Sequence, residues 1–216
     1  MLATYYELAF QDITQFPACP KISGGPQCVQ SNKEFVPEIN APLGMINDTW
    51  YLQCATIPFK VPLYFNITED PGFFLGWSPV KAGDDKIWPD TVVDYKLTPD
   101  GKGYEWIIEF QCNMVDDGSE INFTALNFYA RHYNVTEKYY DELLQAGYDA
   151  GLGIYMDSNF GIYRPPFDDC RGDHFTDKNQ EEFDWYPEPE VRTLQKKILL
   201  LFLFHSSSSV VSSLVL

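Results

Sequence analysis

The sequence predicts a mainly β fold, an antiparallel barrel with one C-terminal α-helix packed outside it. Residues 91–97 and 104–112 alternate apolar and polar side chains, and residues 121–133 form a third run rich in β-branched and aromatic residues. Alternation with a period of two is typical of strands. Three consecutive strands joined by short turns form a meander, and a meander followed by one helix indicates a small barrel.

The first two strands of this meander each present an apolar face. The turn between them contains Pro99, which fixes φ, and Gly101, which tolerates a positive φ. The chain is 16% aromatic, and aromatic rings suit an apolar pocket, so we expect these faces to line a cavity. The predicted ligand-binding residues are Tyr95, Tyr104, Trp106, Ile108 and Phe110.

The predicted helix covers residues 134–151. Asn134 and Glu137 have the spacing of a capping box, and Gly151 ends the segment. The side chains that share one helical stripe are Tyr140, Leu143, Leu144 and Gly147. We expect this stripe to pack on the barrel wall, so the helix is scaffold.

The charge of the chain restricts its partners. The formal net charge is −16 and the pI is near 4.4, which excludes nucleic acid, because phosphate binding needs clustered Lys and Arg. Many carboxylates become neutral at low pH, and repulsion from anionic lipid then falls. Peripheral membrane contact is therefore an expectation for low pH only.

The cysteines predict disulfides rather than a metal site. No two of the five have Cys-x-x-Cys spacing and none has a His partner at zinc-finger spacing, so we predict no metal. One or two disulfides with one thiol left over are expected, and the pairing stays open. The candidates are Cys19, Cys28, Cys54, Cys112 and Cys170.

Four Asn-x-Thr sequons favour passage through the secretory pathway, and hence an oxidising compartment. They begin at Asn47, Asn66, Asn122 and Asn134.

Composition divides the chain into three parts. Residues 1–44 form a predicted N-terminal extension that carries Cys19 and Cys28, and residues 45–170 form the barrel and helix. Residues 171–216 form an acidic linker and an apolar, Ser-rich tail. Three interpretations of residues 198–216 stay open: a membrane tail or removable lipid-anchor signal, an extension without a role, and a buried strand.

Two residues of the predicted barrel resemble the lipocalin pattern. Residues 47–52 would be the first barrel strand, with Trp50 near its middle, and Arg131 ends the last strand. In lipocalins an early Trp lies at the closed end of the barrel under an Arg from the final strand, a cation–π contact that seals that end. The Gly that usually precedes this Trp by two residues is Asp48 here.

The chain also resembles the lipocalin domain of the violaxanthin de-epoxidase family over roughly residues 45–170. Residues 69–74, Glu-Asp-Pro-Gly-Phe-Phe, look like that family's Asp-x-Gly-Phe-Phe strand, turn and strand. Residues 104–112 and 127–131 follow its last two strands. Residues 134–152 resemble its C-terminal helix, and residues 156–170 resemble its closing segment, which ends in Cys.

This resemblance implies a barrel that admits a xanthophyll or similar apolar ligand, with ascorbate as the reductant of its epoxide and a thylakoid lumen location. Opening an epoxide needs a proton donor at its oxygen, and a buried Asp can hold that proton. Asp90 lies near the position of the family's catalytic Asp. The alternative is that Asp90 is a turn residue after Pro89.

Two departures from the family pattern leave the enzymatic prediction open. Phe110 stands where the family has its catalytic Tyr. The region between Trp50 and Gly72 is too short for the family's substrate loop and His-bearing second strand, so we expect an incompletely closed barrel. Three hypotheses follow: a de-epoxidase-like oxidoreductase, a non-catalytic lipocalin-like carrier of a small hydrophobic ligand, and a truncated inactive member.

Overall fold

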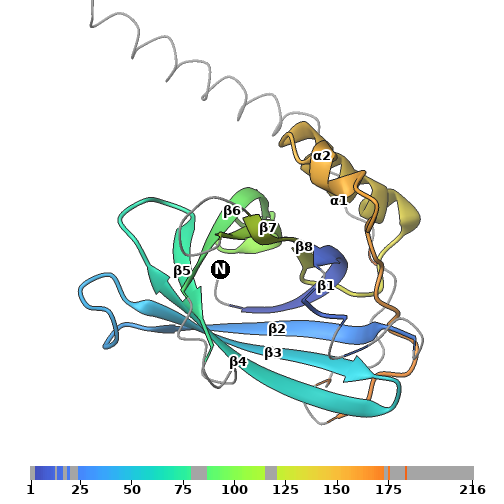
Figure 1. Ribbon diagram of the computed structural model, residues 1–216, viewed down its shortest axis with the longest axis horizontal. Coiled ribbons are helices and arrows are strands. Elements are labelled where there is room, and N and C mark those ends of the chain that lie inside the picture. Colours follow the sequence, from blue (N-terminus) through green and yellow to red (C-terminus); the bar gives the residue numbers. More distant parts are fainter. Residues whose placement is uncertain are drawn as a thin grey trace, which may run out of the picture. The chain divides into compact units, whose positions relative to one another are not determined.

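The computed structural model describes residues 3–12, 14–16, 19, 24–78, 87–114, 121–172, 175 and 183. These residues form a closed antiparallel barrel whose strands follow one another in chain order, with helices after the last strand (Figure 1). The strands are β1 (Ala3–Asp12), β2 (Pro26–Val36), β3 (Met45–Cys54), β4 (Ile57–Ile67), β5 (Phe73–Trp77), β6 (Trp88–Leu97), β7 (Tyr104–Met114) and β8 (Ile121–Ala130). The helices are α1 (Glu137–Asp149) and α2 (Gly153–Met156). The predicted fold class is confirmed.

The barrel begins much earlier than the sequence predicts. β1 and β2 lie within residues 1–44, so that part is no extension, and the predicted first strand, residues 47–52, lies inside β3. β1 pairs with β8 from Tyr6 opposite Ala130 to Asp12 opposite Ala125, and this pairing closes the ring. The expectation of an incompletely closed barrel is therefore wrong.

β1 was not predicted as a strand because both of its faces are buried. Residues 5–12 are all buried, so no polar face marks the strand. The Tyr6 ring contacts the rings of Tyr133, Phe167 and Phe175, which come from the chain after β8. A strand that is buried on both sides loses the alternation by which strands are recognised.

Two disulfides tie this later chain and the β1–β2 connection to the barrel. Cys19 is bonded to Cys54 and Cys28 to Cys170, while Cys112 is a free, half-buried thiol. The prediction of one or two disulfides with one thiol left over is confirmed. Disulfides form and persist in oxidising compartments, so the two bonds are consistent with a secreted or luminal protein.

α1 packs on the outer wall of β8, as predicted. Gly147 faces the Phe128 ring so closely that a Cβ at this position would lie 2.9 Å from it. Tyr140 and Leu143 of the predicted stripe are also buried. The N-cap is Thr136, whose side chain accepts a hydrogen bond from the Tyr139 N–H, so the cap lies two residues after the predicted Asn134.

Among the described residues, no helix combines the length and the hydrophobicity that a membrane span requires. The predicted apolar tail, residues 198–216, and most of the predicted acidic linker lie outside the described residues.

Candidate functional site

The interior of the barrel carries the polar face of β7, and the apolar face lies outside. The Phe110 ring contacts the Tyr155 ring of α2, with centroids 4.8 Å apart. Ile108 pairs with Phe128, which lies under α1. The expectation that the apolar face lines the cavity is therefore wrong. Alternation defines two faces of a strand but does not say which one points inward, and here the helices bury the apolar one.

The remaining predicted lining residues are also away from the centre of the barrel. Trp106 pairs with Ala130, so it shares the outward face of Ile108. Tyr95 is 51% exposed and makes an edge-on ring contact with Tyr104. Tyr104 packs at the margin of a buried cluster that contains Tyr5, Ile107 and Tyr129.

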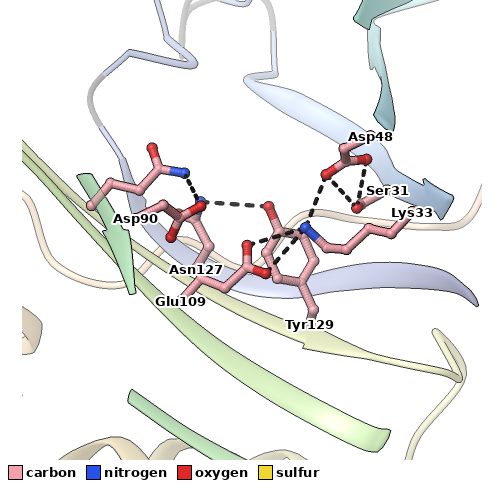
Figure 2. Close-up of polar contacts among 8 residues, drawn as sticks. Ser31, Lys33, Asp48, Asp90, Glu109, Asn127 and Tyr129 are labelled. Carbon is pink, nitrogen blue, oxygen red and sulfur yellow. Dashed lines mark hydrogen bonds and ion pairs between the residues drawn. The ribbon is translucent and has the colours of Figure 1, made fainter. Parts of the chain in front are cut away.

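The centre of the interior is an ion-paired lysine (Figure 2). Lys33 Nζ of β2 lies 2.9 Å from Asp48 Oδ2 of β3 and 3.1 Å from Glu109 Oε1 of β7. The Ser31 hydroxyl lies 2.8 Å from both Asp48 oxygens and donates to that carboxylate. β2 and β7 are not neighbours in the ring, so a contact between them has to cross the interior.

Two aromatic rings complete the surroundings of this lysine. Lys33 Nζ lies 5.2 Å from the ring centroids of Phe65 and Tyr129. Cation–π contacts of this kind strengthen when the cation is removed from water, and the Lys33 side chain is 2% exposed.

A second polar group lies beside the ion pair on β6, β7 and β8. Asp90 Oδ2 accepts a hydrogen bond of 3.2 Å from Gln111 Nε2, and Asn127 Nδ2 donates to the Tyr129 hydroxyl at 3.5 Å (Figure 2). Asp90 pairs with Phe74 and Gln111 within the sheet, so it is a strand residue and not a turn residue after Pro89. Within the described part of the chain, Asp90 Oδ1 and Asn127 Oδ1 are buried without a hydrogen-bond partner.

A carboxyl group of β1 also joins the interior. Gln15, from the connection after β1, donates its side-chain amide to both Glu7 oxygens, at 3.2 and 3.0 Å. Glu7 and Gln15 are both buried. This carboxyl group is therefore held by a neutral amide and not by a cation.

Burial dominates the ionisation of these groups. It raises the pKa of Asp90 well above its ordinary value, and the nearby Glu109 charge adds to the rise. Burial likewise raises the pKa of Glu109, against the opposing charge of Lys33, and the pKa of Glu7. Burial alone would lower the pKa of Lys33, but the Asp48, Glu109 and Asp90 charges outweigh it and raise that pKa. Lys33 thus stays a cation and is no imine-forming amine.

The predicted Trp50–Arg131 pair is absent from the described cation–π contacts. Trp50 packs against the cluster of Cys19, Val29 and Leu52, whereas Arg131 lies beside Gly103 and the Tyr5 hydroxyl. Burial raises the pKa of Tyr5, and the Arg131 charge opposes this rise. The pairing was predicted for a first strand that carries Trp50, whereas Trp50 lies on the third strand and the first strand carries Tyr5.

Comparison with solved structures identifies the architecture. Lobster apocrustacyanin A1 matches with a TM-score of 0.51 and 9% sequence identity over 76% of each chain. Apocrustacyanin C2 matches with a TM-score of 0.50 and 9% identity, also over 76% of each chain. The fold is lipocalin-like. No protein-family model and no curated protein sequence matches the chain.

Most of the charged groups inside this lipocalin-like barrel were not predicted from the sequence as site residues. Lys33 and Glu7 lie on strands within residues 1–44, the part of the chain predicted to be an extension. Glu109 was placed on the polar face of its strand, which was correct, but that face was assigned to the outside. Asp90 was predicted as a site residue, and it is the one member of the polar interior that the sequence identified.

Proposed function

We propose that the protein is a non-catalytic, lipocalin-like carrier that binds a small amphipathic molecule inside the barrel. The pattern along β3 supports this. Ile46 belongs to an apolar cluster with Phe65 and Phe74, Asp48 belongs to the ion-paired centre, and Leu52 belongs to a second apolar cluster. An elongated ligand would therefore meet apolar surface on both sides of a polar centre.

The observation that carries the proposal is that two buried acceptors on neighbouring parts of the interior, Asp90 Oδ1 and Asn127 Oδ1, have no hydrogen-bond partner among the described residues. A buried polar group without a partner costs about 1–3 kcal/mol, so a bound molecule that offers a donor there gains that free energy. Lipocalin-like barrels hold small ligands in their interior, and both acceptors lie on the inward faces of their strands.

Tryptophan fluorescence tests the proposal. Trp50 and Trp88 pack against interior clusters, Trp88 with its ring 6.5 Å from that of Phe65. We expect saturable quenching when retinol is titrated into the full chain with intact disulfides, together with a small molecule in the native mass spectrum of protein purified from its source. A folded protein that shows neither result would contradict the proposal.

A de-epoxidase-like activity is a second candidate, and Asp90 is the observation that favours it. Burial raises its pKa well above the ordinary value, which favours the protonated form that a donor to an epoxide oxygen needs. In the reaction that the resemblance implies, the epoxide oxygen takes up two protons and leaves as water, and ascorbate supplies the two electrons. Phe110, which lies under α2, supplies no hydroxyl to this centre.

Incubation with violaxanthin and ascorbate at mildly acidic pH separates the two candidates. The carrier proposal expects no de-epoxidised product by chromatography. Product that disappears in an Asp90→Asn variant would establish the enzyme instead.

The compartment follows from the same proposal. We propose that the protein is secreted or lies in the lumen of an oxidising organelle such as the thylakoid. The chain has two disulfides, and disulfides form and persist in oxidising compartments.

A further inference from the structure

We infer that the interior selects an organic cation, a small molecule with an apolar body and a protonated amine, and that Asp90 and Asn127 hold the ammonium group. This inference rests on the proposed carrier function and names the class of ligand. It follows from the balance of charge in the interior, from the partners that each carboxyl group has, and from the kind of group that can satisfy the remaining oxygens.

The balance of charge favours a cation. The buried charged groups of the described barrel include the carboxyl groups of Glu7, Asp48, Asp90 and Glu109 and the ammonium group of Lys33. Lys33 pairs with Asp48 and Glu109. Glu7 and Asp90 have only neutral amide donors, Gln15 and Gln111. A ligand cation would therefore give Asp90 a partner of opposite charge, since buried charges are stable only when they are paired.

The geometry places this cation at Asp90. Asn127 stands opposite Glu109, and Asp90 stands opposite Gln111, so Asp90 and Asn127 face the same side from strands that flank β7. Figure 2 shows their side chains directed to the same part of the interior. Both present an oxygen acceptor without a partner. An ammonium group offers three donors, an alcohol offers one and a carboxylate offers none.

The aromatic residues nearby suit a cation as well. Trp88 precedes Asp90 by two residues on β6, so its indole ring lies on the same face, and this ring contacts Phe65 edge-on. The protein already stabilises Lys33 with two carboxylates and two rings. The proposed site repeats that chemistry for a ligand.

An anionic ligand is disfavoured for the same reason. Lys33 is a cation that acts on Asp90, and its two carboxylate partners occupy it. A fatty acid or other carboxylate would have to displace Asp48 or Glu109 and leave that carboxyl group buried without a cation, which is strongly unfavourable.

Binding of an ammonium group carries a proton signature. Asp90 faces Lys33, Asp48, Glu109, Gln111 and Tyr129, and burial raises the pKa of Asp90 in this setting. A docked ammonium group favours the ionised carboxyl group and so lowers this pKa, and any proton that the carboxyl group loses passes to solvent. Calorimetry in two buffers of different ionisation enthalpy, repeated at several pH values above about 4, should therefore detect proton release on amine binding.

The test compares three ligands of matched size by calorimetry on the full, disulfide-bonded chain: 2-phenylethylamine, 2-phenylethanol and 3-phenylpropionate. We expect the amine to bind at least about tenfold more tightly than the alcohol, a difference of about 1.4 kcal/mol, and the carboxylate to bind most weakly. Asp90→Asn should abolish the preference. Asp94→Asn is the matched control, because Asp94 lies on the same strand, is only half-buried, and accepts a hydrogen bond from the Tyr95 N–H.

Each outcome decides something. Equal or tighter binding of the alcohol or the carboxylate would overturn the inference, and so would retinol binding without any amine binding. Failure of retinol and of all three ligands would reject the carrier function itself. If Asp90→Asn does not fold, proton release by the unmodified protein decides the matter: amine binding without proton release contradicts the role of Asp90.

Discussion

Lys33 and Glu109 belong to strands that are not neighbours in the barrel, yet their charged atoms lie 3.1 Å apart in its interior. Backbone hydrogen bonds join each strand only to the next, so this ion pair connects parts of the wall that the sheet does not. The interior therefore contributes specific polar contacts as well as apolar packing, and these contacts can be tested one at a time.

Removing the lysine should be costly. Lys33→Met leaves the buried Asp48 and Glu109 carboxyl groups without their cation, so we expect the free energy of unfolding to fall by about 3–5 kcal/mol. Lys60→Met, on an exposed part of β4, is the matched control and should change it by less than about 0.5 kcal/mol. Urea unfolding followed by fluorescence measures both. A loss no larger than that of the control would show that the ion pair contributes little.

Stability should rise as the pH falls from neutral toward the ordinary range of carboxyl groups, about 4. Burial raises the pKa values of Glu7, Asp90 and Glu109 in the folded state. In this window the folded protein holds protons that the unfolded chain has released, so each added pH unit favours unfolding. The stabilisation is complete below the unfolded pKa and is lost as the pH rises through the folded pKa.

Denaturation midpoints across this pH window check the prediction. Asp90→Asn should make the pH dependence less steep, because one of the three groups no longer titrates, whereas Asp70→Asn, at an exposed turn, should leave it unchanged. A stability that increases with pH over the same window would contradict the upward pKa shifts of these three groups.

The Cys28–Cys170 disulfide should contribute strongly to stability because it joins residues 142 apart in the chain. Replacing both cysteines by serine should lower the free energy of unfolding by about 2–5 kcal/mol. Cys112→Ser, at the free thiol, is the control and should have a much smaller effect. Equal effects of the two changes in a thermal melt would rule out a stabilising role for the bond.

Asn134 is the predicted sequon that the structure places at an exposed position, between β8 and α1. We expect protein secreted from eukaryotic cells to carry a glycan there, and Asn134→Gln to lose one glycosidase-sensitive mass increment. The test changes Asn134 and not Thr136, because the Thr136 side chain also caps α1. An unchanged mass would argue against modification at this site.

The sequence predicts the second half of the barrel well, and the reason is physical. The β7 segment alternates because one face meets the helices and the other meets the polar interior, so its existence and type are visible. α1 is visible because its buried stripe has helical spacing. β1 has two covered faces and no alternation, and it was missed. The orientation of each face was also beyond the sequence, since it depends on which side the helices cover.

The pairing of Tyr6 with Ala130 has a consequence for biosynthesis. The first strand is made early, but its permanent neighbour on one side is the last strand, which is translated near the end of the barrel. Until then β1 keeps an open backbone edge, and contacts so distant in sequence form slowly. We expect newly made chains to be most vulnerable to misassembly in this interval. Chaperones in a secretory or organellar lumen would then protect the open edge of β1.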